Sequence, residues 1–362
     1  MSDTKFSYRR QTWKRLKRNT GAMIGLSIII LSSLLALFGY FFATDFSPNA
    51  NRIILETGGR KPGFSHSFLL VKMELGKPKA NFFTRLLYGV EDTYQYLPIV
   101  NHRIEKDSIF VDKYIDEGLS EKQSYALSKV AAQPIIQKTF FLGSDKFGRD
   151  IYSRLIIGTR VSLSVGLVVV LISLTVGLLL GSLAGYYRGK VDEAIMWFIN
   201  VIWSIPTLLL VFALTLVLGR GFWQVFIAIG LSMWVNVARL VRGQILVVRE
   251  MEYVEAGKAL GFSHLRIIVK HIWPNIMGPV LVIASANFAS AIVIEAGLSF
   301  LGVGVQPPMP SWGLMIKENY NFIITQNPML ALAPGFAIML LVLAFSLLGN
   351  GLRDALEVRT EV

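Results

Sequence analysis

The 362-residue sequence has no cysteine, only four histidines and little charge. Without cysteine, the chain has no disulfide, no thiolate metal ligand and no cysteine nucleophile. No two histidines have the H-x-x-x-H spacing, so no metal site is expected. Charged residues make up 17% and hydrophobic residues 53% of the chain, whereas a soluble domain has about 25% and about 45–50%. The composition therefore predicts a chain that lies largely in a membrane.

The sequence also lacks the usual catalytic motifs. Its three Gly-Lys pairs, at 76–77, 189–190 and 257–258, are followed by proline, valine and alanine. None of them can end a G-x-x-x-x-G-K-[ST] phosphate loop. A G-x-S-x-G elbow and an H-E-x-x-H helix are missing as well. We therefore expect no enzyme and no cofactor bound by this chain, so that any ATP and Mg²⁺ would lie on other subunits.

Six apolar segments are long enough to cross a bilayer, which takes roughly 20 residues. They are 23–43, 161–187, 195–218, 222–241, 278–301 and 331–351. Arg239 lies near the end of the fourth and Glu295 inside the fifth, and neither side chain would be stable facing lipid. An even number of spans places both termini on the same side of the membrane.

Lysine and arginine are concentrated on one side of these spans. The tail 1–22 carries seven of them: Lys5, Arg9, Arg10, Lys14, Arg15, Lys17 and Arg18. The loops after spans two and four are basic too, whereas the opposite short loops contain only Arg220 and Lys317. Because positive residues stay cytoplasmic, both tails, 1–22 and 355–362, are expected inside. Topology thus accounts for the net charge of +12 without a nucleic-acid partner.

Segment 44–154 interrupts the hydrophobic pattern and is expected to be an extracytoplasmic insertion between the first two spans. It is rich in aromatic residues, which favours a small folded cap over a loose spacer. The segment 155–354 would then form a core with five spans.

Four positions inside the spans are candidates for the transport pathway or a gate. Pro206 removes a backbone donor and should kink the third span, either for packing or as a hinge. Glu295 should face the bundle interior, either in a structural hydrogen bond or in contact with substrate. Asn287 is expected to link helices, and Ser299 follows Glu295 by one turn.

The loop 242–277, between spans four and five, has the pattern of two short helices. Gly261 suits a left-handed position that ends the first helix, Ser263 suits the N-cap of the second, and Pro274 should end the pattern. Four residues at helical spacing predict one apolar face: Leu265, Ile268, Val269 and Ile272. Such a hairpin could bind a soluble partner, rest on lipid headgroups or merely connect two spans.

The same loop resembles the E-A-A-x-x-x-G loop of bacterial binding-protein-dependent ABC importer permeases. Glu255, Ala256 and Gly261 match, Gly257 replaces the second alanine, and Pro274 matches the end of the loop. In that family the loop docks into a groove of the ATPase subunit. The resemblance implies the following coupling residues: Glu255, Ala256, Gly257, Gly261, Ser263, Leu265, Ile268 and Pro274.

Two further stretches, 142–163 and 295–313, are similar to the second permease subunit of the oligopeptide and dipeptide transporters. Where such permeases often have Met-Arg followed three residues on by Asp, this chain has Met196, Trp197 and Asn200. Both charges are absent together, as expected if they normally pair at i, i+3.

This resemblance implies an all-α polytopic protein of the bacterial inner membrane, with six transmembrane helices in the type I ABC importer permease fold. It also implies a second homologous permease subunit, two ATPase subunits or domains, an extracytoplasmic substrate-binding protein and membrane lipid as partners. The cargo would be oligopeptides or dipeptides, with nickel chelates or peptide antibiotics as alternatives. An ion-coupled carrier is a rival from another class, and Glu295 is the one buried acid in its favour.

Overall fold

The computed structural model describes residues 3–73, 81–219, 221–324 and 327–356. Most of the predicted tail 355–362, as well as Arg220, lies outside these residues. The chain forms two compact units, each described by itself below. The helical unit comprises Met1–Ser32, Ser162–Gln306 and Ile338–Val362. The sheet unit comprises Ser33–Val161 and Pro307–Ala337.

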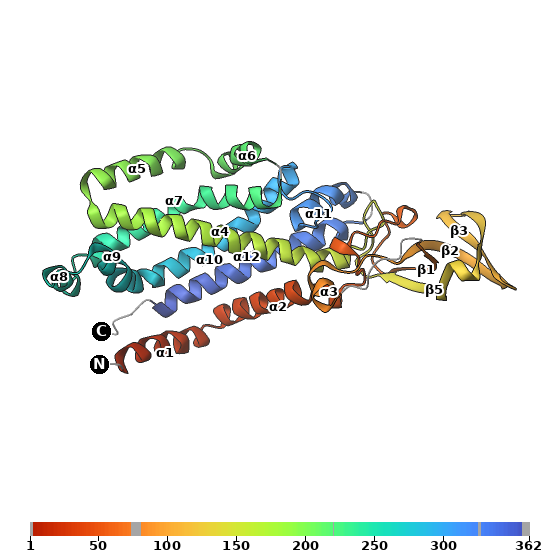
Figure 1. Ribbon diagram of the computed structural model, residues 1–362, viewed down its shortest axis with the longest axis horizontal. Helices are drawn as coiled ribbons and strands as arrows, with labels where there is room; N and C mark the ends of the chain where they lie inside the picture. The colour runs from red at the N-terminus through yellow and green to blue at the C-terminus, as the bar shows by residue number, and fades with distance from the viewer. Residues whose placement is uncertain (1–2, 74–80, 220, 325–326, 357–362) are drawn as a thin grey trace. The chain divides into compact units, whose positions relative to one another are not determined.

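Most of the chain is helical (Figure 1). The helices of the first half are α1 (Asp3–Arg18), α2 (Thr20–Phe42), α3 (Phe82–Tyr88) and α4 (Ile151–Tyr187). The middle of the chain forms α5 (Gly189–Trp203), α6 (Thr207–Leu218), α7 (Phe222–Val248), α8 (Glu252–Ala259) and α9 (His264–Ile267). The last part forms a π-helical turn η4 (Ile268–Ile272), α10 (Trp273–Leu301), α11 (Trp312–Asn319) and α12 (Met329–Leu356).

Five of these helical stretches are long and apolar enough to cross a membrane. They are α2, α4, α7, α12 and the continuous run His264–Leu301, and each overlaps one predicted span. The helices extend beyond the apolar segments, by ten residues at the start of α4 and by seven at the end of α7. The apolar segments read from hydropathy therefore do not give the helix ends.

The third predicted span, 195–218, is not one kinked helix. Helices α5 and α6 meet at an angle of 92° across the break that contains Pro206. Proline has no N–H and pushes the residue before it out of the helical region, so the chain turns at Ile205 and Pro206. Pro206 then acts as N-cap of α6, and its carbonyl accepts from the N–H of Leu210 at 3.0 Å. The predicted kink at Pro206 is thus a 92° break between two helices.

The segment between α2 and α4 contains a five-stranded antiparallel sheet with the order β4-β3-β2-β1-β5 (Figure 1). Its strands are β1 (Phe64–Lys72), β2 (Tyr94–Glu105), β3 (Ser108–Asp116), β4 (Leu119–Ala126) and β5 (Val130–Phe140). Short 3₁₀ turns at Pro48–Ala50, Leu55–Thr57, Leu127–Lys129 and, after α11, Tyr320–Ile323 complete the structure. The sheet is the addition to an otherwise helical fold.

Alternation along the strands gives this sheet two apolar faces. Leu69 and its cross-strand partner Leu97 pack on one face with Ile109 and Val130. The opposite face packs a second cluster: Phe68, Phe140 and Ile54, with Phe64, Tyr96 and Ile136 against them. Side chains of successive residues point to opposite faces, so each face carries a buried cluster of its own and the segment packs as a folded body.

His66 belongs to the aromatic face of the sheet, with its ring 4.8 Å from that of Tyr114 and 5.7 Å from that of Phe64. Burial, and secondarily the nearby Arg60 guanidinium, lower the pKa of His66 from its usual value. The ring is therefore neutral near pH 7 and packs as part of this face.

A buried ionic cluster lies at the start of α4 within the sheet unit. Arg149 donates from Nε to Asp145 at 2.6 Å and from Nη2 to Glu318 at 2.6 Å. Arg154 lies 3.4 Å from the same Glu318 carboxylate. The side chains of Asp145, Arg149 and Arg154 are at most 4% exposed. One carboxylate of α11 thus serves two buried arginines, Arg149 just before α4 and Arg154 in its first turn.

Candidate functional site

The loop after α7 folds as a helical hairpin made of α8, a tight turn and α9 (Figure 1). Gly261 has φ +74° and takes the left-handed position expected from the sequence. The N–H of Phe262 donates to the carbonyl of Gly257 at 3.1 Å, and the N–H of Gly261 donates to that of Lys258 at 2.9 Å. These two bonds form a Schellman motif, which satisfies the last carbonyls of α8. The turn therefore has a fixed backbone geometry.

The second half of the hairpin differs from the prediction at Pro274. The helix does not end there: α9, the π-helical turn η4 and α10 form one run from His264 to Leu301. In an α-helix the proline ring would clash with the carbonyl four residues earlier, that of Lys270. The N–H of Trp273 instead bonds to the carbonyl of Ile268, five residues back, and this wider turn accommodates Pro274 in the helix.

Ser263 occupies the N-cap of α9 with extended backbone, as predicted. Its side chain, however, makes no capping hydrogen bond among the described residues. The helix start is held instead by backbone geometry, with the N–H of Ile267 donating to the Ser263 carbonyl at 3.0 Å. Ser263 thus takes the predicted N-cap position.

The predicted apolar face of the second helix was partly wrong. Leu265 is 72% exposed and Val269 is 40% exposed, whereas Ile267, Ile268 and Ile272 are buried. These three isoleucines pack with Val254 of α8 and with Val241, Ile245 and Ile276 of α7 and α10. The π-helical turn adds a residue to the local repeat, which rotates the buried face away from Leu265. Ile267 does not fit the regular 3.6-residue spacing from which the apolar face was predicted.

Hydrogen bonds with residues of α4 connect the hairpin to the rest of the helical unit. The hydroxyl of Tyr186 lies 2.9 Å from Nδ1 of His264, and Nε1 of Trp273 donates to Oγ of Ser182 at 2.9 Å. Within the hairpin, the Phe262 ring stacks on His271 at 5.8 Å and lies 4.0 Å below the Arg266 guanidinium. Tyr186 and Phe262 were not among the predicted site residues. In the sequence they stand out only as aromatic residues near a turn.

The outer surface of the hairpin is left open. Glu255, Ala256 and Gly261 are exposed, and Leu260 and Leu265 are 73% and 72% exposed. Two large apolar side chains on either side of a rigid glycine turn form a compact protrusion suited to an apolar groove. The predicted coupling residues therefore fall into two groups: Gly257 and Ile268 lie inside the hairpin, and the others lie on or near its surface.

Glu295 lies inside the helical unit, where its carboxylate is buried and hydrogen-bonded. Its side chain is 1% exposed and accepts a hydrogen bond from Oγ of Ser299 at 2.6 Å. Ser299 Oγ in turn accepts from the N–H of Val305 at 3.1 Å. A Cβ on Gly304 would lie 2.2 Å from that oxygen, so only glycine fits. These contacts hold the residues that follow α10 against its last turn.

Asn287 and Pro206, the other two candidates, lie at separate places in the helical unit. Asn287 is buried, and its Nδ2 lies 3.4 Å from Oγ of Ser173, a long bond between α10 and α4. Pro206 lies in the break between α5 and α6, beside a cavity of about 180 Å³. The cavity is lined by both apolar and polar side chains of α5–α7 and α10, including Trp203, Ser232, Asn236 and Ser290.

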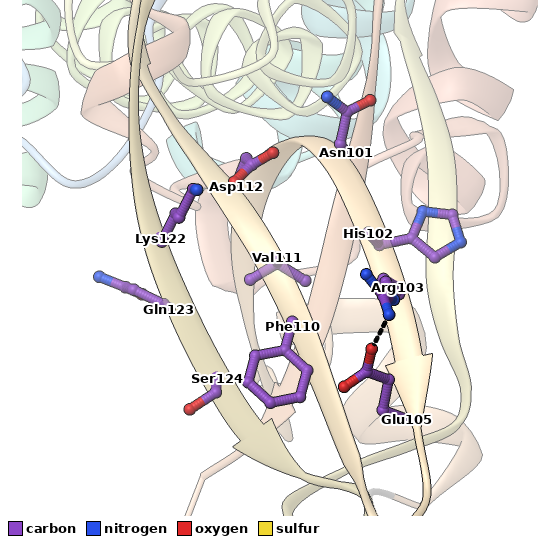
Figure 2. Close-up of a pocket in the computed structure, with 10 residues that line it drawn as sticks. All are labelled: Asn101, His102, Arg103, Glu105, Phe110, Val111, Asp112, Lys122, Gln123 and Ser124. Atoms are coloured by element: carbon purple, nitrogen blue, oxygen red, sulfur yellow. Dashed lines mark ion pairs between the residues drawn. The ribbon is translucent and has the colours of Figure 1, made fainter.

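A larger hollow of about 590 Å³ lies on the sheet, over β2, β3 and β4 (Figure 2). Figure 2 shows His102, Arg103 and Glu105 on one strand, with the Arg103–Glu105 ion pair marked, and Phe110 on the next. Most of the lining side chains are exposed, so this hollow is an open part of the surface. None of the predicted site residues lies in it.

Residues 177–362 match the family described as binding-protein-dependent transport system inner membrane component. Residues 7–56 match the one described as N-terminal TM domain of oligopeptide transport permease C. The interval between the two matches, 57–176, contains the five strands.

Several curated relatives share about two fifths of the aligned residues. A glutathione transport system permease protein, GsiD of Pectobacterium atrosepticum, is 42% identical over 217 residues, 60% of this chain and 72% of that protein. An oligopeptide transport system permease protein, OppC of Bacillus subtilis, is 38% identical over 61% of this chain and 72% of its own length. A dipeptide transport system permease protein, DppC of Alkalihalophilus pseudofirmus, is 42% identical over 60% and 71%.

Among solved structures, one described as inward-facing conformations of the MetNI methionine ABC transporter has a TM-score of 0.48. It is 18% identical and covers 56% of this chain and 96% of its own. The family match spans half of the chain and includes the whole hairpin and the helices around it. The chain belongs to the family of binding-protein-dependent transport system inner membrane components, and it is a transporter permease subunit with the helical fold predicted for that class.

Proposed function

We propose that this chain forms part of the translocation pathway of an ATP-driven importer of short peptides. The observation that carries the proposal is the exposed, rigid hairpin inside the matched family range. Its turn is fixed by the Schellman motif at Gly261, and Leu260 and Leu265 project beside it. Apolar side chains on a preordered turn bind a groove at a low entropic cost.

The hairpin would transmit movement from a partner ATPase to the membrane helices. Its inner face is continuous with the apolar cluster that includes Val241 of α7 and Ile276 of α10. A push on the turn would therefore move the ends of both helices together, because close-packed clusters transmit displacement. ATP and Mg²⁺ would be bound by two ATPase subunits or domains, because this sequence has no phosphate loop.

Within the membrane, we propose different roles for the four candidate residues. The 92° break at Pro206, beside the 180 Å³ cavity, supports a hinge or gate there. The hydrogen bonds of Glu295 and Ser299 support a structural role at the end of α10. Asn287 would link α10 to α4. A structural role for Glu295 would remove the one acid inside a predicted span that favours an ion-coupled carrier.

The other subunits of the importer are proposed from the family to which the chain belongs. A second homologous permease subunit would complete the pathway, and an extracytoplasmic binding protein would deliver the cargo. Both tails, 1–22 and 355–362, and the hairpin would be cytoplasmic, and 44–154 would be outside, as the charge asymmetry predicts.

Peptides are the proposed cargo because the three relatives compared above are named for oligopeptide, dipeptide and glutathione transport. Uptake of labelled tripeptide by a strain that lacks this gene tests the assignment. We expect the rate to fall to background and to return with the wild-type gene on a plasmid. Normal peptide uptake together with lost nickel uptake would instead assign the chain to a nickel-chelate importer.

A further inference from the structure

Two arginines of α7 lie one turn apart, and the chain neutralises only one of them. Arg242 donates from Nε and Nη2 to the two oxygens of Asp192, at 2.5 and 2.6 Å. Arg239 donates from Nη2 to the neutral amide oxygen of Asn200 at 2.9 Å. Its guanidinium carbon lies 3.8 Å from the centre of the Trp203 ring. Among the described residues, no carboxylate forms an ion pair with Arg239.

The position of Arg239 restricts what can surround this charge. It lies in α7, two residues before the end of the apolar segment 222–241 and three before Arg242. An unpaired guanidinium in hydrocarbon costs several kcal/mol, so this side chain must face a polar environment rather than lipid. Asn200 and the Trp203 ring orient the guanidinium without cancelling its charge.

A cavity with both apolar and polar lining lies beside the Trp203 ring that this arginine contacts. Trp203 lines the 180 Å³ cavity at the break between α5 and α6, together with Ser232 and Asn236. Asn236 precedes Arg239 by three residues and therefore lies on the same side of α7. Trp203 thus contacts the Arg239 guanidinium with its ring and also lines the cavity.

We propose that Arg239 binds the carboxylate of a transported peptide at the break between α5 and α6. The inference rests on the proposed peptide cargo, since every unmodified peptide carries a C-terminal carboxylate. The planar guanidinium fits a carboxylate with paired hydrogen bonds. A fixed acid, such as Asp192 beside Arg242, would occupy the cation permanently. A neutral asparagine leaves Arg239 able to bind a passing anion and to release it.

The test compares two peptides in proteoliposomes that contain the complete importer, with saturating binding protein so that capture does not limit the rate. The probes are trialanine, with a free carboxylate, and trialanine amide. We expect the wild type to import trialanine faster than its amide. Arg239→Gln should slow trialanine by about tenfold, which corresponds to one charged hydrogen bond, and leave the amide unchanged. Arg239→Lys should keep part of the preference.

Lys190→Gln is the matched control, because it removes an exposed cation of α5 and should change neither rate. Equal slowing of both peptides by Arg239→Gln, with loss of the second permease subunit during purification, would mean that Arg239 pairs with that subunit instead. An unchanged ratio of the two rates would also overturn the inference while peptide import stands. If the wild-type complex imports neither peptide, the proposed cargo is wrong and the inference fails with it.

Discussion

Two glycines have the same positive φ, but a side chain would have different effects at the two positions. A Cβ on Gly148, at φ +74°, would lie 1.7 Å from the carbonyl oxygen of Ile54, so a side chain there disrupts the fold. Gly261 has the same φ, but nothing lies within 4 Å of its Cβ position. A side chain at Gly261 therefore costs on the order of 1 kcal/mol of backbone strain and leaves the chain itself intact. Only a partner that packs against the turn would detect it.

Gly261→Arg is accordingly expected to separate folding from coupling. The variant should insert at normal abundance and lose most of its transport, because the arginine side chain blocks close packing of the turn in an ATPase groove. The measurements are substrate uptake and co-purification of the ATPase at matched membrane abundance. Gly261→Asn, which tolerates the left-handed region, should be much milder.

Gly257→Ala provides the control within the same hairpin. Its Cβ would lie 3.5 Å from Phe262, an ordinary contact, and alanine favours the helix by about 0.5–1 kcal/mol over glycine. Transport should be retained. Wild-type uptake by Gly261→Arg would contradict the docking role of the turn.

At the scale of elements, the Glu318 cluster shows how α11 is held to the segment before α4. Glu318→Ala would leave Arg149 and Arg154 buried without this partner, at a cost of about 3–5 kcal/mol. The apparent melting temperature of the purified protein should fall markedly. Glu117→Ala removes an ion pair with Arg60 whose acid is 83% exposed, and it should cost less than about 1 kcal/mol. Equal shifts for the two variants would show that the buried cluster is not stabilising.

The sequence predicts an element well where the residues that determine its structure lie within a short stretch of the chain. The spans and the left-handed Gly261 follow from apolar length and from helix-stop chemistry, which act within a few residues. The π-helical turn before Pro274 could not be predicted, because a proline that ends a helix and one that widens it have the same sequence. The widened turn is stabilised by the packing of Ile267 and Ile272 against Val254 and Val241.

The sheet was not predicted strand by strand, although aromatic residues favoured a folded segment. Strand β4 is mostly polar and exposed, and β2 changes from buried to exposed halfway along its length. Neither strand has the sustained alternation that identifies a half-buried strand. The contact between Arg239, Asn200 and Trp203 was equally inaccessible, because it depends on how α5 packs on α7.

At the scale of the whole molecule, the orientation proposed from charge can be tested directly because the native chain has no cysteine. Single substitutions Ser65→Cys and Lys190→Cys place a thiol on the sheet and at the start of α5, both at exposed positions. In intact spheroplasts an impermeant maleimide should label Ser65→Cys and spare Lys190→Cys until the membrane is permeabilised. The reverse pattern would invert the topology.

The central claim is that this permease subunit moves peptides with energy supplied by a separate ATPase. The most direct measurement is ATP hydrolysis and tripeptide uptake by the purified chain alone and by the complete importer in proteoliposomes. We expect no hydrolysis by the chain alone, and in the complete importer hydrolysis and uptake that both rise when peptide-loaded binding protein is added. ATP turnover by the isolated chain, or peptide uptake that persists without ATP and the ATPase subunits, would contradict the account.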